Sequence, residues 1–371
     1  MLGADFYMPT RVFFGENALQ KGKALLLEAG RHAFIVTGKS SAKKCGALDE
    51  LTSLLQDNGI AFTIYDGVLE NPPLMDCYEA GQKAALCGAD FVVGIGGGSP
   101  LDAAKAIAAF AANKDIAPMD VYDDKKRVGK TLPLFAIPTT AGTGSEVNNY
   151  SVLTLEGGKQ KKTFKAADSW PRAAFVDPRY TYTLPHGTTV SCALDAFAHA
   201  LESYLSPKST VFSQAAAVFA GREIFDVLSA LPSEFDAEMR ARLALAATVA
   251  GMAISVTGTG FPHPLGYSLT LLDGVPHGRA CAVFAADYLT YNEKSEEGRA
   301  QIAAYAAAIG TKPAVLKAFL PGVAEVDFSF TEAEIAERVE LVAGAGNYQN
   351  SPYVISKEEM YDIYRAHFLK K

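Results

Sequence analysis

The chain has 371 residues, 49% of them hydrophobic, which is enough for two ordinary domains that each bury a core. Its 34 lysines and arginines against 41 aspartates and glutamates give a net charge of -7 without any basic block, so we expect no nucleic-acid partner. The five cysteines form no C-x-x-C pair, and their odd number gives no sign of a disulfide framework. No signal peptide is expected, and the longest apolar run, 243–256, is short of a membrane span. We therefore expect a cytoplasmic protein without a membrane segment that binds a small molecule.

Short β-rich apolar runs alternate with helical stretches through the first half of the chain. The predicted strands are Ala33–Thr37, Phe62–Tyr65, Phe91–Ile95, Leu134–Ile137 and Ala173–Val176. The predicted helices between them are Leu48–Leu55, Tyr78–Leu86 and Asp102–Ala112. Residues 6–15 could form an edge strand that pairs with another element or another subunit, and 156–159 is a plausible hairpin turn. The alternation predicts β/α units in a doubly wound, mostly parallel sheet.

The second half of the chain is rich in Ala, Leu and Glu and has almost no strand signals. Periodic apolar positions predict helices at 190–205, 212–230, 237–255, 295–308 and 357–369. We therefore predict an α/β domain over residues 1–182 and an all-helical domain over residues 183–371. A cleft between two such domains is the natural place for a ligand site.

Two loops of glycine and hydroxyl residues follow predicted strands. Gly96-Gly97-Gly98-Ser99-Pro100 precedes a helix, whose first amides could bind a pyrophosphate because glycine lets the backbone approach closely. The loop matches G-x-G-x-x-G only in part, so a tight turn is the alternative. The second loop, 138–146, would lie at the same edge of the sheet, where ligands of open α/β sheets bind. It could also be a solvated polar loop, but two such loops favour a phosphate site more than either alone.

Three of the six histidines and one aspartate have spacings that suit a metal. Asp195 and His199 lie four residues apart on one face of a predicted helix, whereas His263 and His277 are expected to flank a glycine-rich loop. One carboxylate and three imidazoles suit Fe(II) or Zn(II) with coordination left open for substrate, and the lack of thiolates is consistent with a catalytic site. The alternative is that each histidine is an ordinary hydrogen-bonded group. The remaining histidines are expected to be structural; they are His32, His186 and His367.

Together these motifs resemble the iron-dependent, or group III, alcohol dehydrogenase family along nearly the whole chain. The residues that carry the resemblance are 12–15, Asn71-Pro72-Pro73, 96–105, 138–146, Asp177-Pro178-Arg179, Ala193–Ala196 with His199, and Pro276-His277-Gly278. The segment from His263 to Tyr267, continued to His277, is most similar to 1,3-propanediol dehydrogenase-like members. The resemblance implies a Rossmann-like α/β domain followed by an all-α domain, in a dehydroquinate synthase-like architecture, and a homodimer formed through the N-terminal strand.

The resemblance also implies roles for individual residues. Iron would be bound by Asp195, His199, His263 and His277, and would hold an alcohol oxygen while hydride passes to the nicotinamide. The residues that would hold the dinucleotide are Gly96, Gly97, Gly98, Ser99, Asp102, Thr139, Thr140, Thr143, Ser145, Asn71 and Lys162. Many members carry a further histidine four residues before a His-Pro-Leu-Gly string, where this chain has Thr259; we assign His263 as the ligand because it precedes His277 by fourteen residues.

The resemblance also bears on coenzyme preference. At the end of the first predicted strand this chain has Gly38, where NAD-preferring relatives often carry an aspartate that would repel a 2'-phosphate. With Ser40, Ser41 and two lysines nearby, we predict a preference for NADP(H) over NAD(H). The leading hypothesis is a metal-dependent NAD(P)-linked oxidoreductase that interconverts small primary alcohols or diols with aldehydes. The alternatives are a dehydroquinate synthase-type lyase, disfavoured by the lack of a dense Lys/Arg cluster around the ligands, and a metal-free scaffold.

Overall fold

The computed structural model describes residues 4–155, 157–158, 160–230 and 232–370. Contacts divide them into two units. The α/β unit comprises Tyr7–Leu184 and Phe235–Thr248, and the helical unit comprises Pro185–Glu234, the chain from Val249 onward and the segment that ends at Phe6. Helix α8 (Ala237–Thr257) is thus divided between the units. That 1–182 and 183–371 are separate domains stays a prediction.

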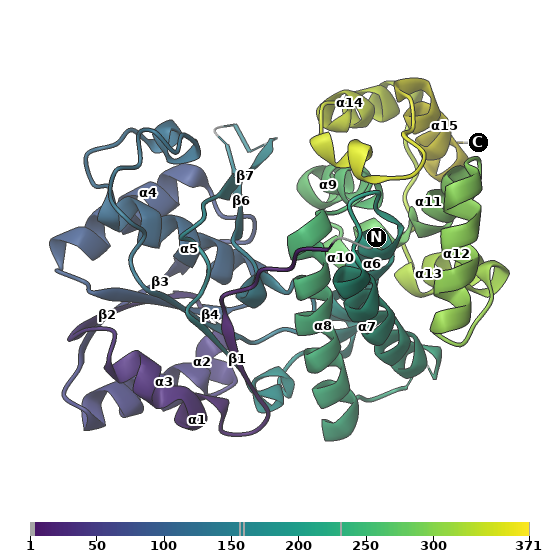
Figure 1. The fold of residues 1–371 in the computed structure, drawn as a ribbon. Helices are drawn as coiled ribbons and strands as arrows, with labels where there is room; N and C mark the ends of the chain where they lie inside the picture. Colours follow the sequence, from purple (N-terminus) through teal and green to yellow (C-terminus); the bar gives the residue numbers. More distant parts are fainter. Residues whose placement is uncertain (1–3, 156, 159, 231, 371) are drawn as a thin grey trace. The chain divides into compact units, whose positions relative to one another are not determined.

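A parallel sheet of six strands forms the centre of the α/β unit, in the order β1-β8-β5-β4-β2-β3. The strands are β1 (Arg11–Phe14), β2 (His32–Gly38), β3 (Ala61–Val68), β4 (Phe91–Gly96), β5 (Leu134–Pro138) and β8 (Ala173–Val176). The helices are α1 (Ala18–Leu27), α2 (Ser41–Lys44), α3 (Ala47–Asp57), α4 (Leu74–Leu86) and α5 (Gly98–Ala112). Figure 1 shows α4 and α5 on one face of the sheet and α1, α2 and α3 on the other. The predicted doubly wound sheet is confirmed.

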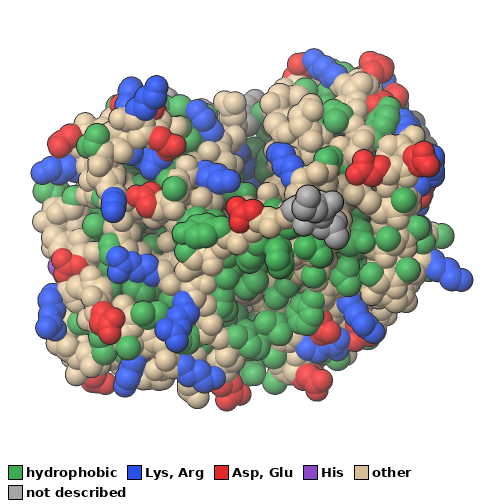
Figure 2. Space-filling view, viewed as in Figure 1, with side chains coloured by type: hydrophobic (Ala, Val, Ile, Leu, Met, Phe, Trp, Pro, Cys, Tyr) green, Lys and Arg blue, Asp and Glu red, His purple; other side chains and the backbone are tan. Residues whose placement is uncertain are grey.

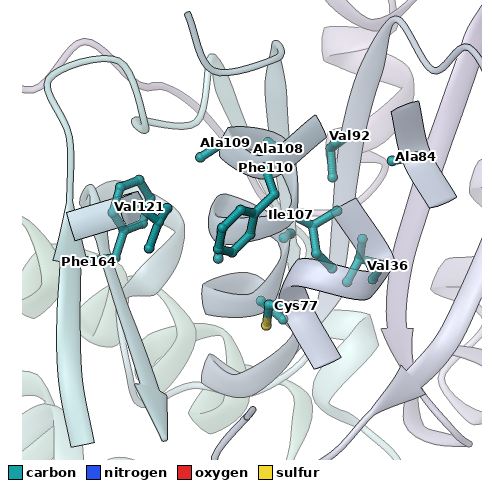
Figure 3. Close-up of a cluster of buried hydrophobic side chains, with 14 of the residues drawn as sticks. Val36, Cys77, Ala84, Val92, Ile107, Ala108, Ala109, Phe110, Val121 and Phe164 are labelled. Atoms are coloured by element: carbon teal, nitrogen blue, oxygen red, sulfur yellow. The ribbon is translucent and has the colours of Figure 1, made fainter. Parts of the chain in front are cut away.

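Alternating strand residues feed two separate cores, one on each face of the sheet. Phe34 and Val92 pack with Ile107 and Phe110 of α5, and Figure 3 shows this cluster, which also contains Cys77. The next residues along the same strands belong to the cluster on the other face, with α1 and α3. Strand β4 is buried along its whole length because both faces are covered, which explains its continuous apolar sequence.

The remaining strands of the α/β unit form a hairpin. Strands β6 (Tyr150–Thr154) and β7 (Lys161–Lys165) pair antiparallel, with Ser151 opposite Phe164. The predicted pairing is confirmed, although two of its turn residues, Glu156 and Lys159, lie outside the described residues. Of the predicted strand over 6–15, only Arg11–Phe14 is a strand, and it pairs with β8 of its own chain. Charged side chains are scattered over the visible face of this unit (Figure 2).

Helices make up the other unit. They are α6 (His186–Leu205), α7 (Val211–Ser229), α9 (Pro262–Asp273), α10 (His277–Ala282), α11 (Ala285–Asn292), α12 (Glu296–Ala308), α13 (Pro313–Ala324), α14 (Glu332–Val342) and α15 (Lys357–Phe368), with the last half of α8. The five helices predicted from periodicity are confirmed to within a few residues. By length and composition α8 could cross a bilayer, but just over half of its most apolar window is buried, as in the core helix of a globular protein.

Candidate metal centre and coenzyme loops

Three imidazoles converge on one carboxylate oxygen in the helical unit. The Nε2 atoms of His199, His263 and His277 lie 3.6, 3.5 and 3.7 Å from Asp195 Oδ1. The rings of His199 and His263 stack with centroids 4.7 Å apart. Nitrogen and oxygen ligands about 2.1 Å from one tetrahedral ion would be about 3.4 Å from each other. The four residues predicted from spacing are therefore brought together at distances close to those of a shared ion.

Three helices supply these side chains. Asp195 and His199 lie one turn apart on α6, as predicted. The other two histidines closely follow non-helical, glycine-containing segments, 258–261 and 274–276, as expected, but the residues between them, 262–273, form helix α9, which the sequence did not predict. His263 is the second residue of α9 and His277 the first of α10. Pro262 and Pro276, which suggest a loop in the sequence, instead mark helix starts, where a missing N–H costs nothing.

Two glycines let these helices approach closely enough to share a site. A Cβ built at Gly278 of α10 would lie 1.8 Å from the carbonyl oxygen of Ser191 on α6. A Cβ at Gly266 of α9 would lie 2.9 Å from the backbone carbonyl of Ala280 on α10. Backbone therefore packs against backbone at both contacts, and this packing sets the position of the histidines.

A carboxylate outside the predicted quartet orients His263. Glu202 is fully buried on α6 and accepts a hydrogen bond from His263 Nδ1, at 2.8 and 2.9 Å from its two oxygens, and another from the amide of Gly260 at 2.5 Å. Because a carboxylate only accepts, the Nδ1 atom carries a proton, and in the neutral ring the lone pair is then on Nε2, toward the centre. The signal in the sequence was the spacing of Glu202 three residues after His199, on the same face of the helix.

The buried donor atoms need a cation. Asp195 Oδ1 and His263 Nε2 are buried and have no hydrogen-bond partner among the described residues. Burial disfavours the charge of Asp195, but His199 and His277 outweigh it and hold the pKa of that carboxyl well below its usual range. Burial also opposes charge on His263, yet Glu202 and Asp195 raise its pKa to about 10. The site thus attracts positive charge, and its donor set fits a divalent transition metal.

Access to the centre is uneven, and a thiol lies beside it. The side chain of His277 is 31% exposed, against 4% for Asp195. Cys281 Sγ lies 3.8 Å from each ring nitrogen of His277. One ligand atom each from Asp195, His263, His277 and Cys281 lie within 4.8 Å of one another. The set predicted from the sequence contained no thiol.

In the α/β unit, the two predicted coenzyme loops lie at the carboxyl ends of neighbouring strands β4 and β5 and contact each other. The amide of Thr139 donates to Gly96 O at 2.9 Å, and a Cβ at Gly97 would lie 3.2 Å from Thr140. A Cβ at Gly98 would lie 2.8 Å from Thr143. Helix α5 begins at Gly98, so its first amides point out of this bare backbone. The hydroxyl of Thr139 is buried with no partner among the described residues, and the cradle fits a phosphate.

Other predicted coenzyme residues support this cradle through protein contacts. The backbone amide of Asn71, a residue with φ of 54°, donates to Ser99 Oγ at 3.2 Å. The carboxylate of Asp102 accepts from Ser145 Oγ at 2.5 Å and from the amide of Val152 at 2.8 Å. Both oxygens of Asp102 are thus bonded to protein, and we expect the residue to support the loops rather than contact a coenzyme.

Lys105, one turn after Asp102, fastens the second loop from within. It is fully buried, and its Nζ donates to Ser145 Oγ at 2.6 Å, Asn148 Oδ1 at 3.1 Å and the carbonyl of Tyr150 at 2.6 Å. Burial lowers the pKa of Lys105 to about 8, although Asp102 opposes this. The lysine therefore joins the glycine loop's helix to the segment that follows β5.

The predicted determinants of coenzyme preference lie at the same edge of the sheet. Gly38 ends β2, which neighbours β4, and Ser40 and Ser41 follow it on the exposed surface. Lys162 is exposed on β7, with its Nζ 4.3 Å from the centroid of the Tyr122 ring. The structure thus brings the glycine and threonine loops together, whereas Lys162, which was predicted to hold the dinucleotide, lies over the Tyr122 ring.

Comparisons with known proteins agree with this pair of sites. Residues 9–178 match the family described as iron-containing alcohol dehydrogenase, and residues 189–368 match its C-terminal part. The 1,3-propanediol dehydrogenase of Klebsiella pneumoniae is 30% identical, with 98% of each chain covered. The chain belongs to the iron-containing alcohol dehydrogenase family. The predicted resemblance, including that to 1,3-propanediol dehydrogenases, is confirmed.

Solved structures place the fold in the same family. An iron-containing alcohol dehydrogenase from Thermotoga maritima has a TM-score of 0.91 and 38% identity, covering 98% of this chain and 99% of its own. The NADPH-dependent butanol dehydrogenase of Clostridium saccharobutylicum, compared by sequence, is 27% identical, with 97% of each chain covered. This member of the iron-containing alcohol dehydrogenase family is therefore an enzyme whose relatives include both diol and simple alcohol dehydrogenases.

Proposed function

We propose that this enzyme interconverts small primary alcohols or diols with the matching aldehydes, using NADP(H) and a divalent metal. The observation that carries the proposal is the convergence of three imidazole Nε2 atoms on Asp195 Oδ1, within 3.7 Å. The names of related enzymes support the substrate class, since they include butanol dehydrogenases, 1,3-propanediol dehydrogenases and lactaldehyde reductases. All of these names describe short-chain compounds.

The metal would be held by Asp195, His199, His263 and His277, and we propose Fe(II), with Zn(II) accepted by the same ligands. When bound, such an ion supplies Lewis acidity that polarises a carbonyl and lowers the pKa of an alcohol. The protein's part is to present the four donors in fixed positions. Glu202 keeps the proton of His263 on Nδ1, and the exposure of His277 leaves one side open to substrate.

The dinucleotide, which supplies or accepts hydride, would be held by backbone amides around Gly97 and Gly98 and by the hydroxyl of Thr139. We propose NADP(H) as the preferred form because Gly38 leaves room for a 2'-phosphate beside exposed Ser40 and Ser41. The family does not decide this point, since NADPH-dependent and NADH-dependent butanol dehydrogenases are both related to the chain. Comparing kcat/KM for NADPH and NADH tests the preference, and a clear advantage for NADH would contradict it.

The metal proposal is tested by metal analysis after anaerobic purification, combined with an aldehyde reduction assay. We expect one divalent ion per chain, and loss of both ion and activity in His277→Ala. His32→Ala is the matched control, because this imidazole bonds Thr63 within the α/β unit, whereas the predicted ligands belong to the helical unit. Full activity of the purified enzyme without a bound ion, or of His277→Ala, would contradict the metal mechanism.

The sequence also left one alternative reaction open. A dehydroquinate synthase-type lyase is not favoured by the comparisons, and net reduction of coenzyme by an alcohol would exclude it.

We also propose a cytoplasmic homodimer. The support is that β1 is an edge strand whose outer side has no partner strand among the described residues. Sedimentation of the purified protein tests the dimer, and a monomer at micromolar concentration would contradict it.

A further inference from the structure

We infer that the ring of Tyr267 forms an aromatic wall beside the exposed side of the metal centre and limits the length of the substrate's carbon chain. The inference rests on the proposed function and narrows its substrate class to alcohols and aldehydes of few carbons. Tyr267 lies on α9 one turn after His263, so both side chains project from the same face of that helix. A half-buried aromatic side chain thus stands directly beside a predicted ligand.

The exposure of the four predicted ligands shows from which side a substrate can reach them. The side chains of Asp195, His199 and His263 are at most 7% exposed. The side chain of His277 is the only one of the four with a substantial surface open to solvent. A substrate therefore approaches the donor atoms beside the His277 ring.

Tyr267 lies against that same imidazole. The ring centroids of Tyr267 and His277 are 5.9 Å apart and their planes differ by 23°, which is an offset stack at a separation common for aromatic pairs. The ring of His263 contacts His277 at 5.4 Å and 70°, nearly edge-on. A carbon chain that extends past His277 from a group held at the donor atoms would therefore lie against the Tyr267 ring.

The packing of α9 against α10 fixes the backbone that carries this ring. Gly266 directly precedes Tyr267, and a Cβ built there would lie 2.9 Å from the backbone carbonyl of Ala280 on α10. His277 is the first residue of the same helix α10. The backbone at Tyr267 therefore cannot withdraw from His277 unless the two helices separate. The ring is a fixed boundary for a bound substrate.

The ordinary explanation of a tyrosine on a packed helix is that its ring fills the core. Tyr288 and Tyr305 fit that explanation, because both are fully buried and their rings contact Phe261 and Phe197. Tyr267 differs in two respects. It is only half-buried, and its ring stacks on the most exposed of the predicted ligands. Its place is that of a substrate contact rather than that of a core side chain.

A fixed boundary discriminates between substrates by length, and one methylene group changes kcat/KM by about 10- to 200-fold in an apolar site. Replacing the Tyr267 ring by the methyl group of alanine leaves room for further carbons. Phenylalanine keeps the ring and lacks only the hydroxyl. The inference therefore predicts that Tyr267→Ala accepts longer chains, whereas Tyr267→Phe keeps the wild-type profile.

Reduction of aldehydes from propanal to hexanal tests this prediction. We expect the ratio of kcat/KM for hexanal to that for propanal to rise at least about tenfold in Tyr267→Ala and to stay unchanged in Tyr267→Phe. Tyr361→Ala is the matched control, because this half-buried tyrosine of α15 bonds Glu340 and should not affect the ratio. An unchanged ratio in Tyr267→Ala, or the same change in Tyr267→Phe, would overturn the inference.

Tyr267→Trp decides the question if the alanine variant does not fold. Its larger ring should lower the ratio of hexanal to propanal, and a ratio that stays constant or rises would overturn the aromatic wall. Failure of the wild type to reduce any aldehyde would instead overturn the proposed function. The two failures are therefore distinguishable.

Binding to the Co(II)-loaded enzyme gives a readout other than activity. Changes in the visible absorption of Co(II) on titration with 1-propanol and 1-hexanol report the two dissociation constants. We expect Tyr267→Ala to gain at least about tenfold in affinity for 1-hexanol relative to 1-propanol, with its affinity for Co(II) unchanged. A loss of Co(II) affinity without a change in this alcohol preference would show that the ring only positions His277, and would overturn the inference.

Discussion

Replacing Glu202 by glutamine should separate metal binding from folding. The Glu202 carboxylate accepts from two donors, the backbone amide of Gly260 and the Nδ1–H of His263. A glutamine offers one acceptor and one donor in place of two acceptors. The backbone amide of Gly260 cannot change its proton, so the amide oxygen should take that bond and the NH₂ group should face His263. His263 must then carry its proton on Nε2, which points at Asp195 Oδ1, 3.5 Å away.

In the variant, the proton on His263 Nε2 can be donated to Asp195 Oδ1, which a metal ion would otherwise bind. The same proton occupies the nitrogen lone pair that would bind the ion. Partners that orient a metal-bound histidine typically contribute about 10- to 100-fold in affinity, or about 1.4–2.7 kcal/mol. We expect at least that loss in Glu202→Gln, with little change in the stability of the metal-free protein. Glu202→Ala should lose affinity and also stability, by about 1–3 kcal/mol, because the Gly260 amide is left buried without a partner.

Two measurements on the same three proteins decide this. Competition with a chromophoric chelator gives Zn(II) affinity, and thermal unfolding in the presence of chelator gives the stability of the metal-free form. Wild-type affinity in Glu202→Gln would show that Glu202 does not control the tautomer of His263. Equal destabilisation of the glutamine and alanine variants would refute the assignment of hydrogen bonds to Gly260 and His263.

Three further predictions test the packing, the buried lysine and the coenzyme site. Gly278→Ala places a Cβ 1.8 Å from the backbone oxygen of Ser191. It should lower the unfolding free energy by about 1–3 kcal/mol and weaken Zn(II) binding. Gly187→Ala is the control, because its Cβ would meet no atom within 4 Å, and it should change neither quantity. Burial lowers the pKa of Lys105 from 10.5 to about 8, so between pH 8 and 10.5 the unfolded chain binds more protons than the folded one. The unfolding free energy of the wild type relative to Lys105→Met should therefore rise with pH over that range, by up to about 1.4 kcal/mol per pH unit. A difference that stays constant with pH would contradict the lowered pKa. Gly38→Asp should move the kcat/KM ratio toward NADH, and an unchanged ratio would remove Gly38 from coenzyme selection.

The α/β half could be predicted closely because its strands and helices differ in both period and composition. Strand β4 is a continuous apolar run ended by glycines, and α3 buries apolar residues at intervals of three to four, at Ala47, Leu51, Leu54 and Leu55. In the helical unit the same reasoning found α6, α7, α8, α12 and α15 but missed α9, α10, α11, α13 and α14. Helices α9 and α10 begin at or directly after a proline, and glycines lie near their ends, so local signals resembled a loop. The close backbone contacts of α10 with α6 and with α9 are tertiary, and no local pattern shows them.

The proposed metal quartet could be predicted from the sequence because two of its members lie one helical turn apart and the other two stand in short Pro/Gly-flanked motifs. Glu202 was not predicted, although it follows His199 by three residues. Such a spacing is common in any helix, and a buried carboxylate has no separate signature. Its role depends on His263 and Gly260 coming near, and that information is tertiary.

The coenzyme loops show how a motif can combine residues with different tasks. The structure presents bare backbone at Gly97 and Gly98, whereas the side chains of Asp102 and Ser145 bond to each other and to Lys105. A phosphate needs amides that point outward from a rigid turn, and those amides come from the glycines. Rigidity must come from elsewhere, and a buried lysine with three acceptors supplies it. Polar residues that accompany a glycine-rich loop can therefore support the loop rather than contact the ligand.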